Sequence, residues 1–97
     1  MSELRDKLKS ELETTDWLAL EPHHGREALM IVHQDLDLLD VAVSVAQDNA
    51  EDIKKWMSEK KLQRPTEEQV ETWKDLREKK YIFIIVQPFV FVQEVLN

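Results

Sequence analysis

The sequence predicts a single α+β domain in which four to five helices pack on a small β-sheet. Two apolar runs, residues 28–33 and 81–93, have the composition of buried strands. Elsewhere the apolar residues recur every three to four positions, which is typical of amphipathic helices. Because 97 residues suffice for one hydrophobic core and not for two, residues 1–97 are expected to form one domain.

The composition limits the possible classes of function. The chain has 20 acidic and 13 basic residues, a net charge of −7, and no cysteine. Negative charge opposes binding to phosphate backbones and to anionic lipid, so we expect neither a nucleic-acid nor a membrane partner. The absence of cysteine excludes disulfides and thiolate chemistry. Because the N-terminus has no apolar run like that of a signal peptide, a cytoplasmic location is expected.

The first quarter of the chain is expected to form two short helices. Leu4, Leu8 and Leu12 recur every four residues, which predicts a helix with a narrow apolar stripe. Asp16 is suited to cap a second helical segment. Pro22, which has no backbone N–H group, and Gly25 are expected to bracket a break after that segment.

The helix expected over residues 37–48 is the most apolar of the chain. Its polar residues fall on one stripe, and its other positions are Leu, Val and Ala. Such a helix needs neighbours on most sides, so we expect it at the centre of the core. Two further helices are expected to begin at Asn49 and at Thr66, where Thr66 and Gln69 fit a capping box.

Residues 81–93 form the second predicted β region. If it is one strand, alternate residues point to opposite faces: Tyr81, Phe83, Ile85, Phe89 and Phe91 to one, and Ile82, Ile84, Val86, Val90 and Val92 to the other. Pro88 cannot donate to a strand ladder, so the sequence leaves open one bent strand or two. Both faces are apolar, and helices of one chain are expected to cover only one of them. This pattern predicts self-association as a homo-oligomer, most simply a dimer.

Aromatic side chains are the candidates for a partner-binding surface, because such residues dominate protein interfaces. The candidates are Phe83, Phe89, Phe91, Trp56 and Trp73. The tryptophans lie on apolar stripes, which favours a place in the core. If Trp56 and Trp73 were exposed together, they would indicate a groove for a partner.

The histidines suggest an alternative, a small-ligand or metal site with or without catalytic activity. The candidate residues are His23, His24, His33 and Asp35. Imidazole and carboxylate groups suit zinc or manganese. Adjacent histidines are poorly placed to share one ion, however, and no known ligand spacing is present. We therefore expect no cofactor and consider an enzyme less probable than a non-enzymatic module.

Two segments resemble those of a known family: Leu36-Asp37-Leu38-Leu39-Asp40-Val41-Ala42 and Val86-Gln87-Pro88-Phe89-Val90-Phe91-Val92-Gln93-Glu94. With Trp17, Trp56 and Trp73, they resemble the short bacterial proteins called domain of unknown function 2288. The resemblance extends over nearly the whole chain and implies a bacterial, stand-alone protein. It implies no activity, because that family has no assigned function. The leading hypothesis is a non-enzymatic interaction module that self-associates and binds an unidentified protein.

Overall fold

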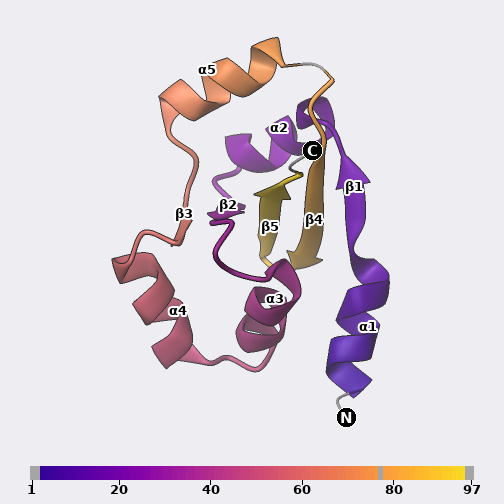
Figure 1. Ribbon diagram of the computed structural model, residues 1–97, viewed down its shortest axis with the longest axis vertical. Coiled ribbons are helices and arrows are strands. Elements are labelled where there is room, and N and C mark those ends of the chain that lie inside the picture. Colours follow the sequence, from indigo (N-terminus) through magenta and orange to yellow (C-terminus); the bar gives the residue numbers. More distant parts are fainter. Residues whose placement is uncertain (1–2, 77, 96–97) are drawn as a thin grey trace.

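The structure, a computed structural model, describes residues 3–76 and 78–95. Within these residues the expected α+β class is confirmed, since five helices surround one mixed sheet of five strands (Figure 1). In chain order the elements are α1 (Glu3–Glu11), β1 (Glu13–Thr15), α2 (Trp17–Gly25), β2 (Leu29–Val32), α3 (Leu38–Ala46), α4 (Ala50–Ser58), β3 (Leu62–Gln63), α5 (Glu67–Asp75), β4 (Tyr81–Val86) and β5 (Phe89–Glu94).

The strands lie side by side in the order β1-β4-β5-β2-β3. β5 pairs with β4 antiparallel and with β2 parallel, so the two predicted β regions form the centre of the sheet. The edge strands β1 and β3 pair antiparallel with β4 and β2. They were not predicted, because segments of 3 and 2 residues are too short to show an alternating pattern.

The C-terminal β region is two strands joined at Gln87 and Pro88. Val86 pairs directly with Phe89 across this turn. Residues directly opposite each other in a hairpin point to the same face. The predicted sorting by alternation is therefore wrong beyond Pro88. The residues Tyr81, Phe83 and Ile85 share a face with Val90 and Val92, whereas Ile82, Ile84 and Val86 share the other face with Phe89 and Phe91.

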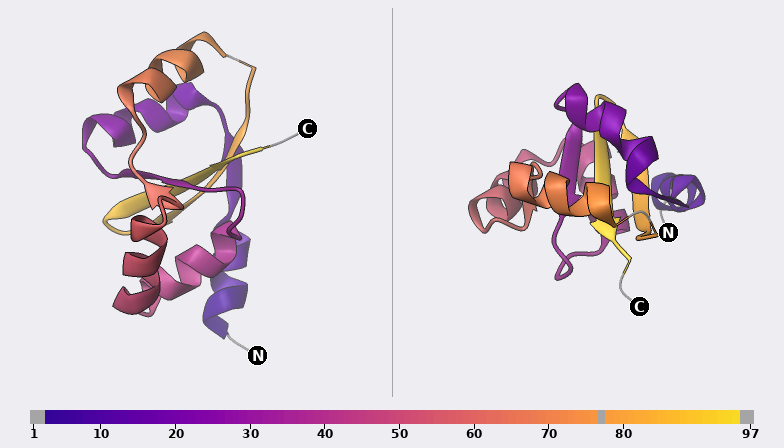
Figure 2. Two further views of the ribbon diagram at one scale, coloured as in Figure 1. Left: turned by 60° about the vertical axis from the view of Figure 1, so that its left-hand side comes forward. Right: turned by 90° about the horizontal axis from the view of Figure 1, so that it is seen from above.

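Helices cover both faces of the sheet, with α2 and α5 on one side and α1, α3 and α4 on the other (Figure 2). The expectation that one chain would leave a face bare is wrong, because short helices joined by tight turns reach both sides. The predicted central helix is confirmed as α3, in which Val41 and Ala42 are fully buried. On the hairpin, the large side chains left in water are Ile85, 47% exposed, and Phe89, 37% exposed.

The helix starts follow the predicted caps. The side chains of Asp16 and Asn49 accept hydrogen bonds from backbone N–H groups in the first turns of α2 and α4. Thr66 and Gln69 form the predicted capping box of α5, with bonds of 2.9 and 3.1 Å. The break predicted between Pro22 and Gly25 does not begin at Pro22, because α2 continues through the proline and ends at Gly25. Pro22 cannot donate a hydrogen bond to the carbonyl oxygen of Leu18, one turn earlier in the helix. Leu18 is exposed, so water can reach this part of α2.

Tyr81, the only tyrosine of the chain, lies in the core between the sheet and α5. It is 1% exposed, and its ring packs edge-on against Trp73 at 5.6 Å. Its hydroxyl has no hydrogen-bond partner among the described residues. Burial raises the pKa of the Tyr81 hydroxyl above its ordinary value, and the negative charge of Glu94 raises this pKa further.

We predict that Tyr81→Phe leaves the stability at pH 7 unchanged or increases it by about 1 kcal/mol, because a buried hydroxyl without a partner is removed. The folded pKa is above the unfolded value, so the wild type keeps its full stability below about pH 10 and loses it at higher pH. The Phe variant lacks this loss. Urea unfolding of both proteins at rising pH measures the difference, and parallel pH profiles would contradict the prediction.

Candidate functional site

The carboxyl ends of β2 and β5 lie at the same end of the sheet, because the two strands are parallel. In open sheets with parallel strands, ligands bind beyond the carboxyl ends of those strands. Here β2 continues into His33, Gln34 and Asp35, and β5 ends with Gln93 and Glu94. Two of the candidates for a histidine site, His33 and Asp35, therefore lie at this end of the sheet.

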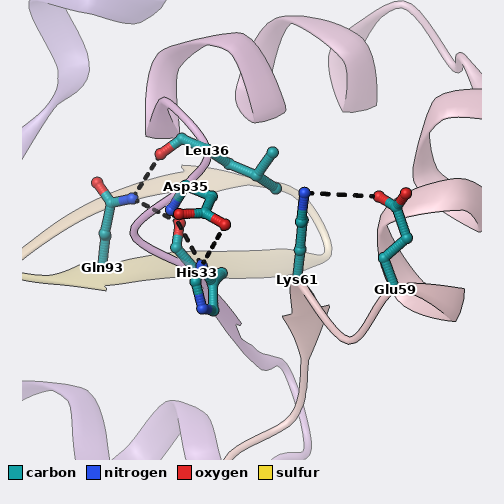
Figure 3. Close-up of polar contacts among 6 residues, drawn as sticks. All are labelled: His33, Asp35, Leu36, Glu59, Lys61 and Gln93. Carbon is teal, nitrogen blue, oxygen red and sulfur yellow. Dashed lines mark hydrogen bonds and ion pairs between the residues drawn. The ribbon is translucent and has the colours of Figure 1, made fainter.

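The turn after β2 is fixed by side-chain amides. Nε2 of Gln93 donates to the carbonyl oxygens of His33, at 3.0 Å, and Leu36, at 2.7 Å (Figure 3). Nε2 of Gln34 donates in the other direction, to the carbonyl oxygen of Glu94 at 2.8 Å. These bonds join the turn to β5 from both sides. Gln93 is the last residue of the β region predicted over residues 81–93, but it was not among the predicted site residues.

The ring of His33 is oriented by its own turn. The backbone N–H of Asp35 donates to Nδ1 of His33 at 3.0 Å, and the Asp35 carboxylate lies 3.7 Å from the same nitrogen. Because Nδ1 accepts a hydrogen bond, the neutral ring has its proton on Nε2. Figure 3 shows the second ring nitrogen on the side away from Asp35. His33 therefore presents an N–H donor at the carboxyl ends of β2 and β5.

A hollow of about 190 Å³ lies beside His33 and is called the polar cleft here. Its polar lining comes from the turn after β2, the α4–β3 connection, β3, α5 and β5: His33, Gln34, Lys60, Lys61, Gln63, Gln69 and Glu94. Oε1 of Glu94 accepts from Nε1 of Trp73 at 3.0 Å and lies 3.6 Å from Nζ of Lys79. Lys61 lies 3.9 Å from Glu59 (Figure 3).

The other two histidines lie at the end of α2. Nδ1 of His23 contacts the guanidinium of Arg26, and the ring of His24 lies 6.0 Å from that of Trp17. His24 lines a hollow of about 440 Å³ between α2 and α5 with Glu21, Glu67, Glu68 and Glu71. Within residues 3–76 and 78–95, no group of three or more His, Asp or Glu side chains is arranged to hold a metal ion.

Another hollow, of about 410 Å³, is almost entirely apolar and is called the apolar groove here. It lies between α4, β3 and the start of β5. Its lining residues are Met30, Val45, Ile53, Met57, Leu62, Gln63, Arg64, Phe89 and Phe91. Met57 is 50% exposed and Phe89 is 37% exposed, so large apolar side chains from α4 and from the hairpin project into water here.

Of the predicted partner-binding residues, Phe89 and Phe91 line the apolar groove. Trp73 is 4% exposed in the core between the sheet and α5, and Phe83 packs against that core. Trp56 packs on the opposite side of the sheet. Trp56 and Trp73 are thus separated by the sheet and form no common groove. The spacing of Ile53 and Met57, four residues apart on one helix face, was the sequence signal for the α4 side.

Among the residues described, no helix has the length and apolar character needed to cross a membrane.

We predict that Gln93→Ala lowers the free energy of unfolding by about 1–3 kcal/mol, because it removes the side-chain donor of the part-buried Leu36 carbonyl. It also removes one of the two donors of the His33 carbonyl, which keeps the backbone N–H of Leu36. Gln34→Ala is the matched control, since it removes one amide-to-carbonyl bond at an exposed position. It is expected to lower stability by less than about 1 kcal/mol. Urea unfolding measures both values. A loss for Gln93→Ala that is no larger than the loss for Gln34→Ala would contradict the prediction.

Comparison with known proteins identifies the family and no activity. Among curated proteins there is no match. Among solved structures, the chain is similar to PA1075 from Pseudomonas aeruginosa, determined in solution by NMR, with 30% sequence identity and a TM-score of 0.82. That alignment covers 100% of this chain and 89% of the other. The family model described as "Protein of unknown function (DUF2288)" matches residues 3–94. The resemblance noted from the sequence is therefore confirmed, and the chain belongs to the DUF2288 family of proteins of unknown function.

Proposed function

We propose that the chain is a non-enzymatic protein-interaction module that self-associates through the apolar groove. The observation behind this proposal is the exposure of Met57 and Phe89 on the two sides of an apolar hollow. Large apolar side chains grouped around a hollow are a mark of interaction surfaces in small proteins. Phe and Met are also enriched at interfaces, where the flexible Met side chain adapts to its partner.

The shape of the groove supports a second copy of the chain as its occupant. The surface combines a hollow with protruding apolar side chains, so two identical surfaces fit together about a two-fold axis. In that arrangement Phe89 and Met57 of each copy enter the groove of the other. Fully burying a side chain of this size contributes roughly 1.5–3 kcal/mol, and the contact adds only the part that is still exposed, 50% of Met57 and 37% of Phe89.

The charges beside the groove also suit a two-fold contact. Arg64 lines the groove, and its guanidinium lies 3.6 Å from the carboxylate of Glu27. The Arg64 and Glu27 side chains are 58% and 75% exposed, so this pair is available to a partner. A surface with one charge of each sign is complementary to a copy of itself, which offsets the repulsion from a net charge of −7.

The apolar surface continues around the end of the hairpin. Ile85 pairs with Val90 next to the turn and is 47% exposed on the face opposite to Phe89. Figure 2 shows this turn at the outer side of the molecule, near β3 and α4. A dimer contact can therefore extend from the groove over the turn, toward the roughly 800 Å² per partner that stable interfaces bury.

The lining of the groove supports binding in preference to catalysis. Its polar side chains are Gln63 and Arg64. Neither an amide nor a guanidinium group acts as a nucleophile or a general base at neutral pH.

We predict that the wild type forms a dimer at micromolar concentration and that Met57→Ser and Phe89→Ser each weaken dimerisation by about tenfold or more. Leu18→Ser is the matched control, because Leu18 is 78% exposed on α2, outside the groove. It is expected to leave the dimer intact. Sedimentation equilibrium measures the dissociation constants, and circular dichroism checks the folding of each variant. A wild type that stays monomeric at millimolar concentration would refute the proposal.

Exchanging charges tests the two-fold arrangement. We predict that Glu27→Arg and Arg64→Glu each weaken the homodimer, because each places like charges across the axis. An equimolar mixture of the two variants is expected to form a heterodimer, since each Arg then faces a Glu of the other copy. If the Glu27–Arg64 ion pair acts only within one chain, mixing the two variants will not restore dimerisation, and the two-fold arrangement is contradicted. Native mass spectrometry distinguishes the three assemblies by mass.

A further inference from the structure

We propose that the polar cleft binds the oxyanion of a small ligand, a carboxylate or a phosphate group. The cleft lies at the carboxyl ends of β2 and β5, where sheets with parallel strands commonly bind ligands. This proposal does not rest on self-association, because His33, Lys60 and Gln69 lie outside the apolar groove, although Gln63 lines both hollows.

Several hydrogen-bond acceptors of the cleft already have donors. Nδ1 of His33 accepts from the backbone N–H of Asp35. Oε1 of Gln69 accepts from the backbone N–H of Thr66 at 2.9 Å, as part of the capping box. Oε1 of Glu94 accepts from the indole N–H of Trp73.

The matching donors remain available. In His33 and Gln69 the acceptor atoms, Nδ1 and Oε1, already accept hydrogen bonds from backbone N–H groups. The donor groups of the same side chains, Nε2–H of His33 and the Nε2 amide of Gln69, can therefore donate to a ligand. Within residues 3–76 and 78–95, the side chains of Lys60 and Gln63 form no hydrogen bond or ion pair. The cleft thus offers imidazole, amide and ammonium donors, which are the groups that bind carboxylate and phosphate oxygens.

The local charge has the sign that an anion requires. Glu94, which lines the cleft, lies 3.6 Å from Lys79, and Glu59, beside it, lies 3.9 Å from Lys61. The third carboxylate nearby, that of Asp35, lies 3.7 Å from Nδ1 of His33. Lys60 adds a further positive charge. In a chain with a net charge of −7, a hollow with an excess of lysine over glutamate is a local exception.

The size of the cleft limits the ligand. A volume of about 190 Å³ is below the roughly 300–1,000 Å³ of pockets that enclose drug-sized molecules or cofactors. The cleft therefore suits a small metabolite or the anionic end of a larger one that extends into water.

The test is a titration followed by amide NMR, with sodium phosphate and sodium acetate as separate probes at constant ionic strength. We expect saturable shifts of the His33, Gln63 and Gln69 amides with at least one probe. Saturation by phosphate alone identifies a phosphate site, and saturation by acetate identifies a carboxylate site. Shifts that rise linearly, or that are spread over the lysines of the whole surface, would overturn the proposal.

Two variants separate a local site from a general effect of charge. Lys60→Gln removes the unpaired lysine of the cleft and is expected to weaken binding about fivefold. Lys9→Gln removes the same charge from α1, where the residue is exposed, and is expected to leave the affinity unchanged. An equal loss in both variants, or no loss in Lys60→Gln, would contradict binding in the cleft.

Discussion

The parallel pairing of β2 with β5 determines where the rest of the chain lies. β5 has β4 on one side and β2 on the other, in the register Leu29↔Val90 and Ile31↔Val92, so its side chains are buried on both faces of the sheet. A strand in this position needs helices above and below it. The segment between β2 and β4 supplies them, with α3 and α4 on one side and α5 on the other (Figure 2).

The same pairing separates two kinds of surface at opposite ends of the strands. At the amino ends, Met30 and Phe89 line a hollow whose other wall is the apolar face of α4. At the carboxyl ends, His33 and Glu94 line a smaller hollow with lysine and glutamine side chains. An apolar groove with exposed rims favours contact with a protein surface, whereas a donor-rich cleft favours a small anion. The two proposed binding surfaces therefore differ in chemistry and lie on one pair of strands.

Local signals in the sequence identified most elements. The cap residues Asp16, Asn49 and Thr66 marked helix starts, and the apolar runs marked the central strands. Features that depend on distant contacts were not predictable. β1 and β3 are strands only because β4 and β2 pair with them. The reversal of faces after Pro88 follows from the turn geometry, which alternation alone does not contain.

The candidate sites were predictable only in part, for the same reason. Phe89 and Phe91 were identified as aromatic residues suited to an interface, but their neighbours Ile53 and Met57 come from α4, far away in sequence. His33 was identified by its residue type, whereas the donors around it come from the α4–β3 connection and α5. Self-association was inferred from a face thought to be bare, whereas the exposed large apolar side chains that lie close to the groove are Met57, Phe89 and Ile85; Leu18 and Leu76 are exposed elsewhere.

The central claim is that two copies of the chain meet at the apolar groove. Its most direct test is an isotope-filtered NMR experiment on a mixture of labelled and unlabelled protein, which detects only contacts between different molecules. The account predicts intermolecular contacts between the Phe89 ring of one copy and the methyl groups of Met57 and Ile53 of the other. The claim would be contradicted if these groups gave no intermolecular contacts at a concentration where the NMR signals of the whole protein are observed.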